Sequence, residues 1–212
     1  MISHVLFDFG GVVIDHTVPQ ALPVIFEKIG AWYEVLPREV RAFWNQKIDP
    51  EYMAGNMTYD EVLALHEKQY GKPFPENSRE FCIAPMEHAV FHQEIEHYIY
   101  TLKAQWYVVC LLSDMSKERK DLFTSKDWYR SFDVLFNSCD IGYSKAKDNR
   151  DDTTNMYNHV LKELWVSGEQ CLFIDDKQNN CLQANAVWIH TIQAFSPQQT
   201  ILEVNEFLEK NR

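Results

Sequence analysis

The sequence lacks any CxxC pair, and no apolar run approaches the ~20 residues that a membrane-spanning helix needs. Its five cysteines are an odd number, and Cys110 and Cys171 lie inside apolar runs, where a free cysteine packs as a small hydrophobic residue. This usage fits a reducing compartment. The N-terminus has no basic region and only a short apolar run, so no signal peptide is expected. We therefore predict a cytoplasmic protein without a membrane partner.

Positive charge is also scarce, because 20 Lys and Arg residues stand against 31 Asp and Glu residues. The formal net charge of -11 argues against a nucleic-acid partner, since clustered Lys and Arg are needed to bind the phosphate backbone. An anionic small molecule would need a local positive site on such a chain. The 212 residues, 46% of them hydrophobic, suffice for one large core or for a core with a small accessory domain. Monomer and homodimer are both compatible with this composition.

A short strand followed by an aspartate and two glycines begins the chain. The segment Val5–Asp8 predicts a buried strand that ends in a carboxylate, and Gly10 and Gly11 then let the backbone turn sharply and approach a ligand closely. A carboxylate at the carboxyl end of a buried strand lies where open α/β sheets bind their ligands. The alternative is that Asp8 only caps a turn, which is a common use of Asp before Gly.

The segment 15–94 shows helical rather than strand periodicity. Thr58 and Glu61 form a capping box, and the helix that they begin should end at Gly71. The other expected helices are one from Ala21 that stops near Gly30, one around Val35–Trp44 and one around Met86–Phe91. The aromatic residues of this segment are expected to serve mostly in its own core. We therefore predict an all-helical cap domain at 15–94, inserted between two parts of a core at 1–14 and 95–212.

From residue 95 onwards, helical and strand patterns alternate. The expected strands are Tyr107–Leu112, Val134–Phe136, Cys171–Ile174 and Trp188–Ile192. The expected helices are Ile95–Leu102, Lys117–Thr124, Met156–Trp165, Asn179–Ala186 and a last one after Ser196. This alternation predicts an α/β protein with a doubly wound parallel sheet, which is a Rossmann-like core.

Three of the expected strands end in hydroxyl or carboxylate residues. Asp8 ends the first, Ser113 and Asp114 end another, and Asp175 and Asp176 end a third. Because the strands are parallel, these side chains should meet around one crevice. Carboxylates gathered in this way repel one another unless a cation lies among them. Oxygen ligands without nearby His or Cys favour Mg²⁺, and Mg²⁺ favours phosphoryl chemistry; alternatively, the Asp175–Asp176 pair only begins a helix.

Asp8 can also serve as a nucleophile, since a carboxylate can attack phosphorus and form an aspartyl-phosphate. Such a reaction needs a metal ion to neutralise charge, a hydroxyl to hold phosphoryl oxygens and a lysine to offset the remaining negative charge. Ser113 suits the second role and Lys145 the third. Lys147 is a close competitor of Lys145, and a plain surface position is the alternative for either lysine.

Four stretches of this chain resemble, in their order and approximate spacing, the four motifs of the haloacid dehalogenase (HAD) superfamily. They are Asp8–Val13, Leu111–Asp114, Gly142–Lys145 and Phe173–Asp176. The helical insertion lies where one subfamily carries a helical cap. The chain looks most similar to the branch of the bacterial alpha-D-glucose-1-phosphate phosphatase and the N-terminal phosphatase domain of soluble epoxide hydrolase.

The resemblance implies a set of metal ligands for Mg²⁺. Asp8 would be both the nucleophile and a ligand, and the Gly10 carbonyl would be a second ligand. Asp176 would be the main carboxylate ligand of the fourth motif, supported by Asp175 or Asn180. The implied partner is a small phosphorylated metabolite.

The resemblance also implies catalytic and substrate-binding residues. The catalytic set comprises Asp8 as nucleophile, Ser113 as the phosphoryl holder and Lys145 as the charge-balancing cation. The substrate-binding set comprises Gly10, Gly11, Ser113, Asp114 and Lys145.

Two departures from the family pattern stand out. Most phosphatases of the family carry a second aspartate two residues after the nucleophile as general acid and base, and this position is Gly10 here. General acid–base catalysis contributes about 10²–10⁴-fold, so slow turnover or a preference for easy leaving groups is expected, and phosphomutase activity is not. The other departure is a long polar stretch at 146–154 after the motif lysine, which is expected to be a solvated loop rather than an edge of the substrate entrance.

Three functions remain open on these residues. The leading one is a Mg²⁺-dependent phosphatase for a small phosphate ester, of which a sugar phosphate is one candidate. A 2-haloacid dehalogenase-like hydrolase would use the same aspartate on carbon, but it needs no metal, and the Asp175–Asp176 pair argues against it. The third is a catalytically weak protein that binds a phosphorylated ligand, because Gly10 replaces the usual acid–base aspartate.

Overall fold

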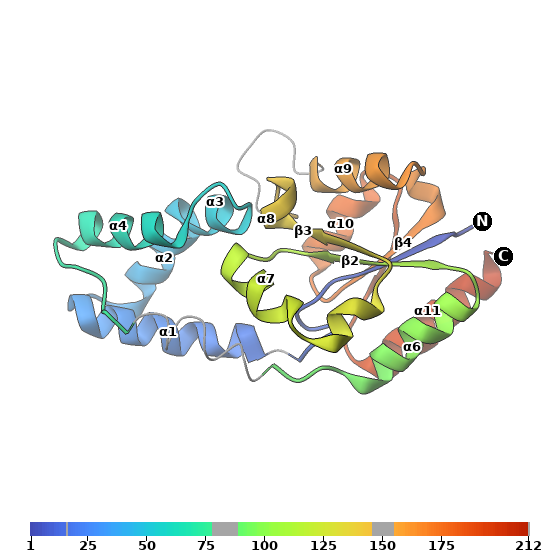
Figure 1. Ribbon diagram of the computed structural model, residues 1–212, viewed down its shortest axis with the longest axis horizontal. Coiled ribbons are helices and arrows are strands. Elements are labelled where there is room, and N and C mark those ends of the chain that lie inside the picture. The colour runs from blue at the N-terminus through green and yellow to red at the C-terminus, as the bar shows by residue number, and fades with distance from the viewer. Residues whose placement is uncertain (16, 78–88, 146–154, 212) are drawn as a thin grey trace.

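A parallel five-stranded sheet forms the centre of the computed structural model, which describes residues 1–15, 17–77, 89–145 and 155–211. The strands are β1 (His4–Phe7), β2 (Val108–Ser113), β3 (Val134–Asn137), β4 (Cys171–Asp175) and β5 (His190–Gln193). Their order across the sheet is β3-β2-β1-β4-β5, so the first strand of the chain lies in the middle (Figure 1). The predicted Rossmann-like core is confirmed.

The register of the central strand brings three strand ends to one edge of the sheet. Phe7 of β1 pairs with Leu111 of β2 and with Ile174 of β4. Beyond this pairing, the backbone N–H of Asp8 donates to the Ile174 carbonyl at 2.8 Å. The polar residues that end β1, β2 and β4 therefore surround one crevice.

Two layers of helices cover the two faces of the sheet. On one face lie α6 (Gln93–Ala104) and α11 (Pro197–Lys210), and on the other lie α9 (Asn155–Leu164) and α10 (Gln178–Asn185) (Figure 1). Val5 and Phe7 pack into the first layer and Leu6 into the second, which is why the strand is apolar along its length. The shorter connecting elements are α7 (Lys117–Thr124), α8 (Ser138–Ile141) and 3-10 turns at Asp127–Ser131 and Gly168–Gln170.

A helical cap lies to one side of the sheet and between β1 and β2 in the chain (Figure 1). It consists of α1 (Thr17–Tyr33), α2 (Pro37–Lys47), α3 (Asp49–Met53) and α4 (Tyr59–Tyr70). The capping box is confirmed, because the Glu61 N–H donates to Thr58 Oγ1 at 3.3 Å and the Thr58 N–H donates to the Glu61 carboxylate at 2.7 Å. The domain limits of 1–14 and 95–212 for the core and 15–94 for the cap stay a prediction.

The cap has an aromatic core of its own. His66 is fully buried, and its ring lies 5.3 Å from that of Phe43 and 4.9 Å from that of Phe74. Burial lowers the pKa of His66, whose Nδ1 lies 3.0 Å from the Val62 carbonyl oxygen. A neutral imidazole is thus part of the packing. None of the helices in the described ranges combines the length and apolarity that a bilayer crossing needs.

Two expected helix limits are wrong. Gly30 does not end α1, which continues to Tyr33. A Cβ at Gly30 would lie 2.8 Å from the Val35 carbonyl oxygen, so glycine is needed there for a close contact rather than for a helix end. Phe91 is not helical, because it forms an isolated antiparallel bridge with Ile14, while positions 86–88 of that expected helix lie outside the described residues. The sequence also did not predict the short helices α3 and α8.

The cap touches the core where α3 meets α8. Ser138 Oγ donates to the Met53 carbonyl oxygen at 2.5 Å. Next to this bond, Gly55 approaches Cys139 so closely that an added Cβ would lie 2.4 Å from the Cys139 carbonyl oxygen. Gly55 also has a φ of 74°, so glycine satisfies both the conformation and the close approach. This contact joins the cap to α8, which directly follows β3.

Gly55→Ala should lower the free energy of unfolding more than Gly71→Ala. Gly71 has a similar φ of 70°, but an added Cβ there would meet nothing within 4 Å. A left-handed φ costs an alanine about 1–2 kcal/mol, and overpacking against the Cys139 backbone should add about 1–3 kcal/mol at Gly55 alone. Urea unfolding of both variants measures the difference, and equal losses would contradict a close cap–core contact at this point.

Candidate active site

Lys145 lies at the centre of the crevice. It follows α8 and a left-handed turn at Gly142, and its side chain is only 1% exposed. Lys145 Nζ donates to Asp8 Oδ1 at 2.5 Å and to Asp175 Oδ2 at 2.8 Å, so it joins the ends of β1 and β4. Lys147, its competitor in the sequence, and the polar stretch 146–154 lie outside the described residues.

Burial and opposite charge act against each other in this ion cluster. Burial acts to lower the pKa of Lys145, but the nearby carboxylates, Asp175 first among them, raise it well above its usual value, so the lysine is charged. Burial, followed by the negative charge of Asp175, raises the pKa of Asp8 to about 7, although Lys145 and Lys177 act to lower it. Burial and the negative charge of Asp175 therefore outweigh the two lysines at Asp8.

Asp175 is held on both of its oxygens. Oδ2 accepts hydrogen bonds from Lys145 Nζ and from Asn180 Nδ2, each at 2.8 Å, and Oδ1 accepts from the Lys177 N–H at 2.8 Å. The backbone of Asn180 is held in turn, because its main-chain carbonyl oxygen accepts a hydrogen bond from the Tyr157 hydroxyl at 3.0 Å. Asp175 thus orients Lys145, and both of its oxygens already accept hydrogen bonds.

Three carboxylates of the crevice are close enough to share a metal ion. Oxygen atoms of Asp8, Asp175 and Asp176 all lie within 4.8 Å of one another. Among the described residues, no other three His, Cys, Asp or Glu side chains come together in this way. These hard oxygen donors, beside a crevice where phosphate oxygens could complete the shell, suit Mg²⁺.

Gly10, Ser113 and Asp114, which the sequence also predicted as site residues, line the same crevice. Ser113 is buried at the end of β2, and Asp114 Oδ1 accepts the N–H of Lys145 at 2.9 Å, so Asp114 positions the lysine segment. Gly11 turns the chain after Asp8 with a φ of 84°. At Gly10, by contrast, an added Cβ would meet nothing within 4 Å. The space beside the nucleophile candidate is therefore open.

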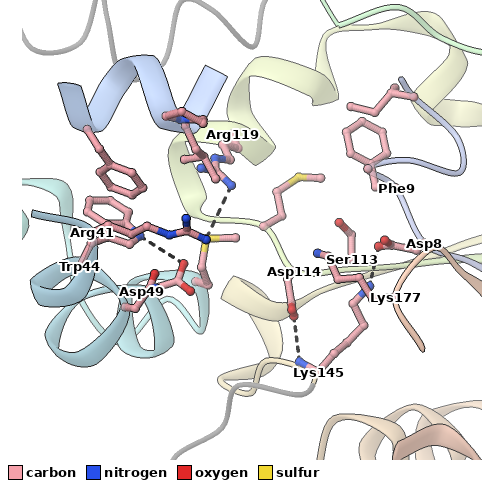
Figure 2. Close-up of a pocket in the computed structure, with 18 of the residues that line it drawn as sticks. Asp8, Phe9, Arg41, Trp44, Asp49, Ser113, Asp114, Arg119, Lys145 and Lys177 are labelled. Atoms are coloured by element: carbon pink, nitrogen blue, oxygen red, sulfur yellow. Dashed lines mark hydrogen bonds and ion pairs between the residues drawn. The ribbon is translucent and has the colours of Figure 1, made fainter. Parts of the chain in front are cut away.

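A cavity of about 650 Å³ extends from this crevice to the cap. Figure 2 shows Asp8, Ser113 and Lys145 at one end of it, and Arg41 and Asp49 at the other. The sequence prediction did not include four basic residues that line the cavity: Arg38 and Arg41 from α2, Arg119 from α7, and Lys177. Lys177 could have been found, because it directly follows Asp176. The arginines could not, because helical spacing does not say which face of a helix turns toward a ligand.

The family model of the haloacid dehalogenase-like hydrolases matches residues 2–187. Since this match spans most of the chain, the chain belongs to that family of hydrolases, and the predicted family is confirmed. The finer placement in the branch of the glucose-1-phosphate phosphatase stays a prediction.

Individual relatives are distant. The drimenol cyclase drtB of Aspergillus calidoustus is 23% identical over 197 residues, which is 91% of this chain and 34% of that protein, so the chain spans about a third of its length. A HAD-like family hydrolase from Porphyromonas gingivalis has a TM-score of 0.71 at 20% identity and covers 98% of both chains. A HAD family enzyme from Bacteroides thetaiotaomicron, solved with magnesium and inorganic phosphate, has a TM-score of 0.69 at 19% identity and covers 92% of this chain and 95% of its own. Such similarity shows a shared fold.

In the absence of divalent cations, the free energy of unfolding of the wild type should decrease as the pH rises, compared with that of the Asp8→Asn variant. The pKa of Asp8 is about 7 in the folded protein, against about 3.9 in an unfolded chain. Between these values the folded state holds a proton that the unfolded state has lost, so the free energy of unfolding decreases with pH from about pH 4 to about pH 7. Asparagine cannot titrate and removes this slope.

Urea unfolding in EDTA at about pH 5 and about pH 8 measures this difference between wild type and variant. Asp121→Asn, at an exposed position of α7, is the matched control and should follow the wild type. A stability difference between wild type and Asp8→Asn that stays constant over this range would contradict a raised pKa at Asp8.

Proposed function

We propose that this protein is a Mg²⁺-dependent phosphatase that hydrolyses a small phosphate ester through an aspartyl-phosphate on Asp8, with a sugar phosphate as one candidate substrate. The observation that carries the proposal is the buried contact between Asp8 and Lys145 beside two further carboxylates. Membership in a hydrolase family supports it. The Bacteroides enzyme that shares this fold was solved with magnesium and phosphate, which is consistent with the proposed chemistry.

Asp8 would act in two steps. A carboxylate oxygen attacks phosphorus while the ester P–O bond breaks and the alcohol leaves with the bonding electrons. Water then attacks the same phosphorus, the bond to Asp8 breaks, and inorganic phosphate is released. Through both steps the Lys145 ammonium group would offset negative charge and the Ser113 hydroxyl would hold a phosphoryl oxygen, both from buried positions where electrostatic interactions are strong.

Asp175 at the end of β4 and Asp176 directly after it would have different roles. Magnesium bound here would neutralise the charge that gathers between the carboxylates and the phosphoryl group. The proposed ligands are Asp8, Asp176 and the Gly10 carbonyl. Asp175 supports them indirectly, because both of its oxygens already accept hydrogen bonds, from Lys145, from Asn180 and from a backbone N–H.

Gly10 leaves the position beside the nucleophile without an acid or base. The departing alcohol must then take its proton from water, and esters of acidic alcohols suffer least from this. Position 10 has room for a side chain and does not have a left-handed φ, so an aspartate can be accommodated there. The absence of the acid–base group is therefore a chemical limit and not a steric requirement.

Asp8→Asn should lower phosphate release by at least about a thousandfold, because an amide cannot replace the carboxylate as nucleophile. Release from a panel of phosphate esters, with Mg²⁺ and with EDTA, measures this. Asp121→Asn is the matched control and should keep the wild-type rate. Full activity of Asp8→Asn would exclude Asp8 as the nucleophile, and full activity in EDTA would exclude the metal.

Gly10→Asp should raise the turnover of alkyl phosphates by about 10–100-fold, which is a part of what acid–base catalysis can supply. Aryl phosphates with acidic leaving groups should gain less, because these groups leave without a proton. Gly10→Asn has the same size without the acid and is the control. If the two variants gained equally, or if alkyl phosphates gained nothing, proton transfer would not be what limits turnover.

A further inference from the structure

The cavity is lined by more charged and apolar side chains than a phosphoryl group alone would contact. Asp8, Ser113, Lys145 and Lys177 line its core end. Apolar side chains from both the core and the cap also line it: Phe9, Met115 and Phe123 from the core, and Phe26 and Met53 from the cap. The cap adds a third component, which is a pair of arginines on α2.

Arg38 and Arg41 reach the cavity from one face of α2. They are three residues apart, and Asn45, four residues further, lines the same cavity, as the helical repeat requires. Both arginines are exposed. Neither makes an ion pair or a hydrogen bond within the described ranges of the chain.

Two other charged side chains of the cavity already have protein partners. Lys145 is paired with Asp8 and Asp175. Asp49, an acidic group at the cap end, accepts a hydrogen bond from Trp44 Nε1 at 3.4 Å. A guanidinium group without a protein partner is well suited to bind a carboxylate or a phosphate through two parallel N–H donors.

The charge of the cavity also differs from that of the chain. The described residues that line it carry five positive side chains and four negative ones, whereas the whole chain has a net charge of -11. The positive ones are Arg38, Arg41, Arg119, Lys145 and Lys177, and the negative ones are Asp8, Glu27, Asp49 and Asp114. A cleft of this kind in an acidic protein concentrates anions locally.

We propose that Arg38 and Arg41 bind a second anionic group of the substrate, which is then a phosphate ester that also carries a carboxylate or a second phosphate. This inference rests on the phosphatase function proposed above. Figure 2 places Arg41 across the cavity from Asp8 and Lys145, so an anion at the arginines is distinct from the phosphoryl group at the nucleophile. The apolar lining contacts the carbon chain that joins the two groups.

Three matched series of alkyl phosphates test this second site. Compounds of equal chain length end in a methyl group, in a carboxylate or in a second phosphate. The readout is the ratio of kcat/KM for the anionic compound to kcat/KM for the methyl compound, measured with Mg²⁺. The carboxylate and phosphate arms show which anion the arginines prefer.

In the wild type, we expect a ratio of at least about tenfold for one of the two anionic series. Arg38→Gln and Arg41→Gln should each lower this ratio, and the double variant should bring it to about one. Lys47→Gln removes a positive charge from the exposed surface of the same helix, outside the cavity, and should keep the wild-type ratio. Added salt should lower the wild-type ratio as well.

A wild-type ratio near one, or a ratio that survives in the double variant, would overturn the second anion site. An equal loss for all three series would also overturn it, because the arginines would then act on the reacting phosphoryl group. If no ester is hydrolysed, the phosphatase function fails separately. In that case, calorimetry on the wild type and on the arginine variants measures the dissociation constants of the same three series. The ratio of the dissociation constant of the methyl compound to that of the anionic compound then tests the anion site in place of the kcat/KM ratio.

Discussion

The site depends on the burial of one lysine between two carboxylates. A buried ammonium group is stable only when it is paired with opposite charge. Asp8, Lys145 and Asp175 come from the end of β1, the segment after α8 and the end of β4, so these three parts of the chain must assemble together. Removal of the lysine would leave uncompensated buried charge, at a cost of about 3–5 kcal/mol. The same contact holds a cation where a phosphoryl group needs one.

Two neighbouring aspartates acquire different properties from their surroundings. Asp175 is enclosed and accepts three hydrogen bonds, while Asp176 is less buried and shares the carboxylate cluster with Asp8. The lysine is thus oriented by one residue and the proposed metal site is completed by the next. The same strand end supplies both residues, because Asp175 is the last residue of β4 and Asp176 follows it directly.

The cap contributes to the cavity without depending on it for stability. Its own aromatic core around His66 holds α1, α2 and α4 together, and the close contact at Gly55 ties it to the core domain. The α2 face that carries Arg38 and Arg41 is therefore free to serve a ligand. Since the chemistry is carried by the strand ends, a cap of this kind allows the substrate to be selected separately from the reaction.

Local signals in the sequence determined the strands, the polar residue at each strand end, the capping box at Thr58 and the four motifs, because each depends on a few consecutive residues. Gly30 shows the limit of such signals, since a glycine serves equally to end a helix or to permit a close contact. Only the tertiary structure decided that both oxygens of Asp175 accept hydrogen bonds and that the arginines of α2 face the cavity. The reason is physical: Lys145 and Asp8 lie 137 residues apart in the chain, and the direction in which a helix face turns is set by packing against the rest of the molecule.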